Sequence, residues 1–209
     1  IQTGASALIS NALGAGDEDR AVEYQLQAIV LAVIVAVTVT VLMLVFLRPL
    51  YLLFGADGEV LAGGLRYMRV IAGGGVIIVL AQVLNAGLVA RGDTKAFRNV
   101  LLAMMLLNVG LDPLLMFGLS IGGVRIVPPL REAGTAIATV ALQGAGLGYL
   151  IVRGVRRGVY RRASLRRCAP RADVMRELIG QSAPATLDVL MVTLGAFVIN
   201  YFVADFGRN

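Results

Sequence analysis

Two acidic residues lie inside long apolar stretches of this sequence, where a carboxylate could do chemistry. Asp112 follows Asn108 by four residues and directly precedes Pro113. Residues four apart share a helix face, and Pro113 cannot donate a hydrogen bond to the carbonyl of Val109, which its ring displaces. The spacing therefore predicts a carboxylate, an amide oxygen and a freed carbonyl close together, which suits Na⁺ or a proton. The alternative is a kinked helix in which Asp112 and Asn108 only satisfy the opened backbone.

Other polar residues in the apolar stretches are candidates for lining a substrate cavity. A carboxylate in the hydrocarbon costs roughly 2.5–3.5 kcal/mol and is by default a functional candidate. Asp188 lies near a helix end, where water can reach it, so a transport role and a solvated acid both stay open. For the neutral residues, an interhelical hydrogen bond of about 0.6 kcal/mol explains each one equally well. The candidates for the cavity are Gln82, Asn85, Gln143 and Asp188.

The composition indicates a membrane protein and excludes several kinds of site. Of the 209 residues, 58% are hydrophobic and 15% are charged, whereas soluble domains have about 45–50% apolar and about 25% charged residues. The sequence has no His, which excludes Ser–His catalysis and His metal sites. The single Cys168 excludes a disulfide within the sequence and a two-Cys zinc site. We therefore expect no cofactor, no metal and no enzymatic activity, since the two acids are also too far apart for a twin-aspartate pattern.

Long apolar runs predict an all-α, polytopic helical bundle. A spanning helix needs about 20 apolar residues, and continuous runs of that length differ from the alternating segments of about 10 residues in a membrane barrel. The sequence starts at Ile1 without a charged leader, so we expect an internal piece of a longer protein. Residues 1–13 form the last half of one predicted helix, and the predicted full spans are 25–47, 70–90, 100–119, 133–152 and 178–204.

The basic residues predict how the bundle is oriented. Thirteen of the 19 Lys and Arg residues lie in the segments 14–24, 91–98 and 153–176, which alternation of the spans places on one side. This side is predicted to be cytoplasmic. An anionic-lipid or nucleic-acid patch is the alternative for the third segment, but Tyr160 is its only stacking ring, so we expect no nucleic acid partner. Its arginines are Arg153, Arg156, Arg157, Arg161, Arg162, Arg166, Arg167, Arg171 and Arg176.

Glycines predict turns and close helix contacts. Gly144 and Gly148 form a small-xxx-small pair, which favours close approach of a neighbouring helix. The sequence Gly14-Ala15-Gly16 lacks the Lys-Ser/Thr of a phosphate loop. It is better explained as a helix end, followed by Asp17 as the N-cap of the next helix.

Five short motifs, in this order, resemble those of MATE (multidrug and toxic compound extrusion) transporters. The order and spacing match over nearly the whole sequence, so the set is more specific than any single motif. The motifs are 12–17 with Ala21 after the second helix of that family, 90–95 after the fourth, 108–113 in the fifth, 134–139 at the start of the sixth and 181–184 at the start of the seventh.

The resemblance implies a transporter of twelve helices in two lobes, of which this chain covers late helix two to helix seven. Residues 1–152 would be part of the N-terminal lobe, 153–176 a basic cytoplasmic linker, and 177–209 the first helix of the C-terminal lobe. The implied function is Na⁺- or H⁺-coupled antiport that exports organic, often cationic, drugs or toxins by alternating access. Such a protein would be a multi-pass monomer in the inner (plasma) membrane, with small organic substrates and the lipid bilayer as partners.

The resemblance also implies a cation-coupling site. In one branch of the family this site uses an Asn and an Asp on helix five and a Thr on helix six, which correspond here to Asn108, Asp112 and Thr139. The Asp that helix one adds to this site lies outside this sequence. A Glu that another branch has in the middle of helix seven has no counterpart here.

A flippase for lipid-linked sugars or polymers, from the same superfamily, is the alternative function. Such proteins often carry basic residues within their spans. None of the predicted spans contains Lys or Arg, which favours the exporter.

Overall fold

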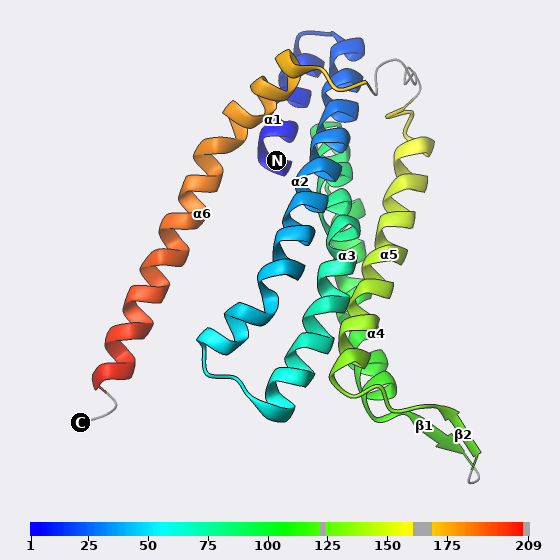
Figure 1. Cartoon of the computed structure of the whole chain (residues 1–209). Coiled ribbons are helices and arrows are strands. Elements are labelled where there is room, and N and C mark those ends of the chain that lie inside the picture. Colours follow the sequence, from blue (N-terminus) through cyan, green and yellow to red (C-terminus); the bar gives the residue numbers. More distant parts are fainter. Residues whose placement is uncertain (122–123, 161–168, 207–209) are drawn as a thin grey trace.

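The computed structural model describes residues 1–121, 124–160 and 169–206, and these form six helices and one short hairpin (Figure 1). Five of the helices are long and apolar enough to cross a membrane, α6 over Ala172–Ala196. The predicted all-α, multi-pass membrane architecture is thereby confirmed. The helices are α1 (Gln2–Gly14), α2 (Glu18–Leu53), α3 (Gly58–Ala90), α4 (Lys95–Phe117), α5 (Glu132–Arg156) and α6 (Ala172–Phe206).

Helix α3 lies at the centre of the described bundle. It contacts α1 and α2 on one side and α5 on the other, and α4 packs mainly against α5. One core cluster joins α1, α2, α3 and the first turns of α6, through residues such as Ile9, Val83 and Leu178. A second joins α3, α4 and α5, through residues such as Leu88 and Leu150. Helix α6 starts against α1 and then diverges from the other helices (Figure 1).

The turn between α1 and α2 has the predicted geometry. Gly16 has φ +76°, a left-handed conformation that glycine adopts at low cost. The carboxylate of Asp17 then accepts a hydrogen bond from the backbone N–H of Arg20 at 2.9 Å, so Asp17 is the N-cap of α2. The helix-end interpretation of this glycine segment is therefore correct.

The chain between α4 and α5 differs from the prediction. Helix α4 ends at Phe117, and Gly118 with φ +78° leads into an antiparallel hairpin of β1 (Leu119–Ile121) and β2 (Val124–Val127). The predicted span 100–119 therefore continues two residues too far, and the hairpin was not predicted. Leu119 pairs with Val127 and Ile121 with Val124. The hairpin extends away from the helices (Figure 1).

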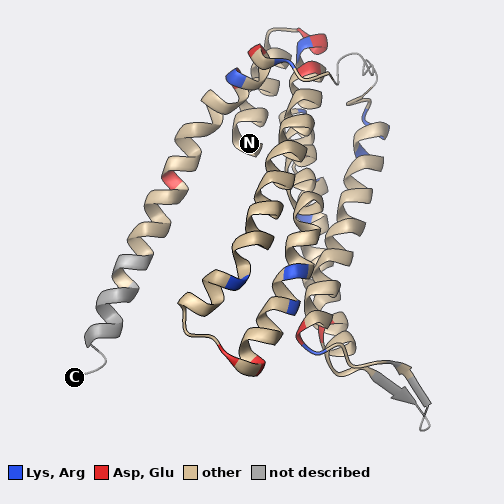
Figure 2. Cartoon of the chain, viewed as in Figure 1, with Lys and Arg blue, Asp and Glu red and all other residues tan. Residues whose placement is uncertain are grey.

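Helices α2 and α3 are longer than the apolar runs that predicted them. Helix α3 starts at Gly58, twelve residues before the predicted span, and so contains Arg66 and Arg69, while α2 contains Arg48. The expectation that no basic residue lies within a spanning helix is therefore wrong for the helices as they fold. Charged residues gather mainly at the two ends of the bundle, with a few along the helices (Figure 2). Arg66 donates a hydrogen bond to Glu132 of α5 at 3.4 Å.

Candidate functional site on helices α4 and α5

Two glycines of α5 set how this helix lies against α4. A Cβ on Gly134 would lie 2.4 Å from the carbonyl oxygen of Leu115, and one on Gly146 would lie 2.7 Å from the side chain of Val100. The helices are therefore antiparallel and in close contact at both points. Thr139 lies between the two contacts along α5, which places it at the level of residues 108–112 on α4.

The predicted small-xxx-small pair, Gly144 and Gly148, does not contact a neighbouring helix closely in the described structure. A Cβ on Gly144 or on Gly148 would meet nothing within 4 Å in the described structure. Gly134 and Gly146 allow the close approach instead. The prediction of a close contact at Gly144 and Gly148 is therefore wrong for the contacts among the described residues, because both glycines face away from α4.

Asn108 and Asp112 are half-buried and present unused acceptors. The Oδ1 atom of each is buried and has no hydrogen-bond partner in the described structure. A buried polar atom without a partner needs an explanation, such as an ion or a proton. Pro113 lies within α4 and removes the donor for the carbonyl of Val109, which adds a third acceptor on the same stretch of helix.

Thr139, the third predicted residue, lies on the neighbouring helix α5. Its hydroxyl donates to the carbonyl of Thr135 at 3.0 Å, so its oxygen can still accept or coordinate through its lone pairs. A carboxylate, an amide oxygen, a hydroxyl and a backbone carbonyl are oxygen ligands of the kind that hard cations prefer.

The residues predicted to line a substrate cavity are distributed over three helices. Asn85 of α3 is 4% exposed, and its Oδ1 atom has no described partner. Gln82 of α3 and Gln143 of α5 are half-buried, whereas Asp188 of α6 is exposed. Their common role in a cavity stays a prediction.

Sequence reasoning missed polar contacts that attach the start of α6 to α2. The side-chain amide of Gln27 donates to the carbonyl of Ala169 at 2.7 Å and accepts from the backbone N–H of Arg171 at 3.0 Å. The hydroxyl of Tyr24 donates to Glu177 at 2.5 Å. Two glutamines inside an apolar run, Gln25 and Gln27, were the available signal, because a buried amide needs a partner.

The predicted basic segment also contacts the bundle. Asp93, whose side chain is 3% exposed, accepts from Arg153 at 2.8 Å and lies 3.3 Å from Arg157. The hydrogen bond from Arg153 and the nearby guanidinium charges hold the pKa of Asp93 below its usual range, although burial opposes this shift. Arg171 pairs with Glu23 and Asp173. Four other arginines of the predicted basic segment, at positions 161, 162, 166 and 167, lie outside the described residues.

This geometry defines a multi-pass helical membrane protein with buried, unpartnered polar atoms on α4. Comparison with known proteins places it in a family. A family model for MatE matches residues 1–114, so the chain belongs to the MatE family, whose members are membrane transporters. This confirms the resemblance drawn from the sequence.

Two similar proteins have names that state a transport function. The chain is 30% identical over 155 residues to a protein named FAD transporter from Shewanella oneidensis, covering 73% of this chain and 33% of that protein. It is 26% identical over 208 residues to the multidrug export protein MepA of Staphylococcus aureus, covering 100% of this chain and 44% of that protein. The chain thus spans less than half the length of these relatives.

Solved structures share the arrangement of the helices. The structure named as the outward-facing conformation of a multidrug resistance MATE family transporter of the MOP superfamily has a TM-score of 0.80 and 26% identity, over 94% of this chain and 42% of that one. A MOP superfamily transporter from Pyrococcus furiosus, for which a reverse polarity of the binding pocket is described, gives the same TM-score, identity and coverage.

Proposed function

We propose that this chain is part of a cation-coupled antiporter that exports small organic compounds, often cationic ones, by alternating access. The observation that carries the proposal is the pair of buried, unpartnered Oδ1 atoms of Asn108 and Asp112 beside Pro113. A carboxylate or amide oxygen without a partner in a low-dielectric site is stabilised when it binds a cation, and a carboxylate also when it binds a proton. The relation to MepA supports drugs as substrates.

In this proposal, Asp112 couples the binding of the ion to the release of the substrate. Binding of Na⁺ or H⁺ neutralises its carboxylate and lets the oxygens around Pro113 and Thr139 close on the ion or on the new O–H. This changes the geometry of α4 against α5 and releases the substrate from a cavity in the N-terminal lobe. A ligand drives such a change only by its differential affinity for the two states.

The proposal extends to the organisation of the whole protein. Residues 1–152 belong to the N-terminal lobe, 153–176 to a basic cytoplasmic linker and 177–209 to the first helix of the C-terminal lobe, in a monomer of the inner (plasma) membrane. The contacts of Gln27 with Ala169 and Arg171 support a linker whose far end is held close to the first lobe.

The test is replacement of Asp112 by Asn in the intact protein, which keeps the shape and removes the charge and the proton site. We expect loss of ethidium efflux from drug-sensitive cells, with unchanged amounts of protein in the membrane. Asp57→Asn, at an exposed turn, is the matched control and should keep full efflux. Wild-type efflux by Asp112→Asn would remove the site assignment.

A second substrate class is favoured by the relation to the FAD transporter. FAD is an anionic dinucleotide, so it differs from ethidium in charge. Measuring FAD release and ethidium efflux in the same strains separates the two substrates, and Asp112→Asn should stop whichever one the protein exports.

A further inference from the structure

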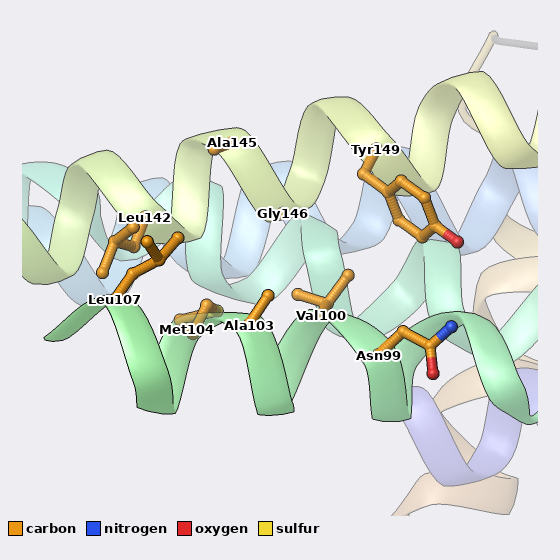
Figure 3. Close-up of a pocket in the computed structure, with 9 residues that line it drawn as sticks. All are labelled: Asn99, Val100, Ala103, Met104, Leu107, Leu142, Ala145, Gly146 and Tyr149. Carbon is orange, nitrogen blue, oxygen red and sulfur yellow. The ribbon is translucent and has the colours of Figure 1, made fainter. Parts of the chain in front are cut away.

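An apolar pocket of about 370 Å³ lies between α4 and α5 (Figure 3). We call it the α4–α5 slot. Ala103 and Leu107 of α4 line it from one side, and Leu142 and Ala145 of α5 from the other. Ala103, Leu107 and Ala145 are exposed, so the slot is open towards the surroundings of the described bundle. Its volume lies within the usual range for small-molecule pockets, about 300–1,000 Å³.

The slot has a polar end and an apolar end. Asn99 and Tyr149 lie together at one end, and Leu107 and Leu142 lie at the other (Figure 3). At 1.5 Å per residue, the distance along α4 from Asn99 to Leu107 is roughly 12 Å. A site with this gradient along a membrane helix fits an amphiphile that has its head near the membrane surface and a chain in the hydrocarbon.

Three exposed cations surround the polar end. Lys95 lies one helical turn before Asn99, on the same side of α4. Arg98 donates to the side-chain oxygen of Asn99 at 3.3 Å, which directs its guanidinium to the mouth of the slot. Arg156 lies two turns after Tyr149 on the same side of α5. Both helices therefore present positive charge where the slot opens.

These charges are available for a ligand. Within the described part of the chain, Lys95, Arg98 and Arg156 form no ion pair. The nearby buried carboxylate of Asp93 is already held by Arg153 and Arg157. An anionic group at the mouth of the slot would thus complement a local excess of positive charge.

The slot ends next to the proposed ion site. Asn108 and Asp112 follow Met104, which also lines the slot, by four and eight residues, so they continue the same side of α4 further along the helix. The lining of the slot on α4 ends at Leu107, so neither Asn108 nor Asp112 belongs to it.

We infer that the α4–α5 slot binds one acyl chain of an anionic phospholipid from the leaflet at the arginine-rich end of the bundle, with the phosphate held by Lys95, Arg98 and Arg156. Charge complementarity selects an anionic lipid over a zwitterionic one, since each Lys or Arg near the surface contributes about 1 kcal/mol, or about fivefold in affinity. The inference does not depend on the transport mechanism.

A tryptophan reporter tests this inference in the intact protein. The 209-residue sequence has no Trp, so Leu106→Trp, at an exposed position beside Leu107, gives one local signal once any Trp elsewhere in the protein is replaced by Phe. The protein is placed in vesicles of equal parts phosphatidylglycerol and phosphatidylcholine, with either lipid brominated as a quencher. We expect phosphatidylglycerol to be preferred at the reporter by about fivefold or more.

Three further variants separate the slot from general surface charge. The double change Lys95→Gln and Arg98→Gln should remove the preference. Ala103→Phe, which fills the slot, should lower it to the level of bulk lipid. Arg176→Gln removes an exposed arginine from α6 and should leave it unchanged.

Two results would overturn the inference. One is equal quenching by both lipids, or a preference that survives Ala103→Phe. The other is no quenching by either lipid in a correctly folded protein, since another part of the protein would then cover the slot. Circular dichroism and monodisperse elution establish folding for each variant.

Discussion

At the scale of single residues, buried polar atoms distinguish the ion site from structural pairs. Asp93 and Asp112 are both acids in a protein with few charged residues. Asp93 has two arginine partners, whereas the Oδ1 atom of Asp112 has none in the described structure. A permanently paired carboxylate stabilises the fold, and an unpaired one responds to ions. The two residues should therefore behave differently when each is replaced by Asn.

We predict that Asp93→Asn destabilises the protein without altering the ion site. Loss of a charged hydrogen bond to a buried acceptor should lower the melting temperature in detergent by about 5 °C. Because the folded-state pKa of Asp93 is depressed, its contribution is complete above about pH 5 and declines as the pH falls below about 4.

The measurement is thermal unfolding of both proteins as a function of pH. The melting temperatures of wild type and Asp93→Asn should differ at pH 7 and converge in acid, with exposed Asp57→Asn as the control. A constant difference at all pH values would mean that the ion pair of Asp93 is not its source.

At the scale of elements, the helices follow from apolar runs, while their contacts follow from where small residues face a neighbour. Helix α2 has 36 residues and would be about 54 Å long, which exceeds a hydrocarbon core of about 30 Å. Hydropathy therefore located the helices but underestimated their length. The hairpin was missed because strands of three and four residues are too short for a clear alternating pattern.

We predict opposite effects for two glycines of α5. Gly134→Ala places a methyl group 2.4 Å from the carbonyl oxygen of Leu115, which forces a backbone shift and should cost about 1–3 kcal/mol. Gly144→Ala meets nothing within 4 Å and should be neutral or stabilising by up to about 1 kcal/mol, since Ala favours helix.

Retention of monodisperse protein after heating in detergent measures both variants side by side. If Gly134→Ala were as stable as Gly144→Ala, the close packing of α4 on α5 at this point would be wrong.

At the scale of the whole molecule, α6 starts within the bundle and then diverges from it. The first turns of α6 belong to the core of the bundle through Val174 and Leu178, and Ser182 packs against Gly4 of α1. Further along, the helix diverges from α1 (Figure 1), and residues such as Met191 are exposed. This arrangement agrees with a chain that carries the start of a second lobe.

We predict that the arginine-rich segment 153–176 lies in the cytoplasm. Cys168 is the only cysteine of the sequence and belongs to this segment, so it reports the side directly. A membrane-impermeant maleimide should label it in inside-out vesicles and leave it unlabelled in intact cells, because basic loops are retained on the cytoplasmic side. Cys168→Ser controls for other thiols, and labelling in intact cells would reverse the topology.

The sequence alone determined the class of protein, the approximate spans and the residues with unusual chemistry, because long apolar runs and intramembrane acids are costly in any other setting. Asn108 and Asp112 were found in this way, whereas Thr139 and the family came from the resemblance of short motifs. Only the tertiary structure decided which acid has partners, that Gly134 and Gly146 rather than Gly144 face α4, and that Gln27 holds the chain before α6. Such contacts join residues distant along the chain, and a linear pattern carries no information on which face of one helix meets another.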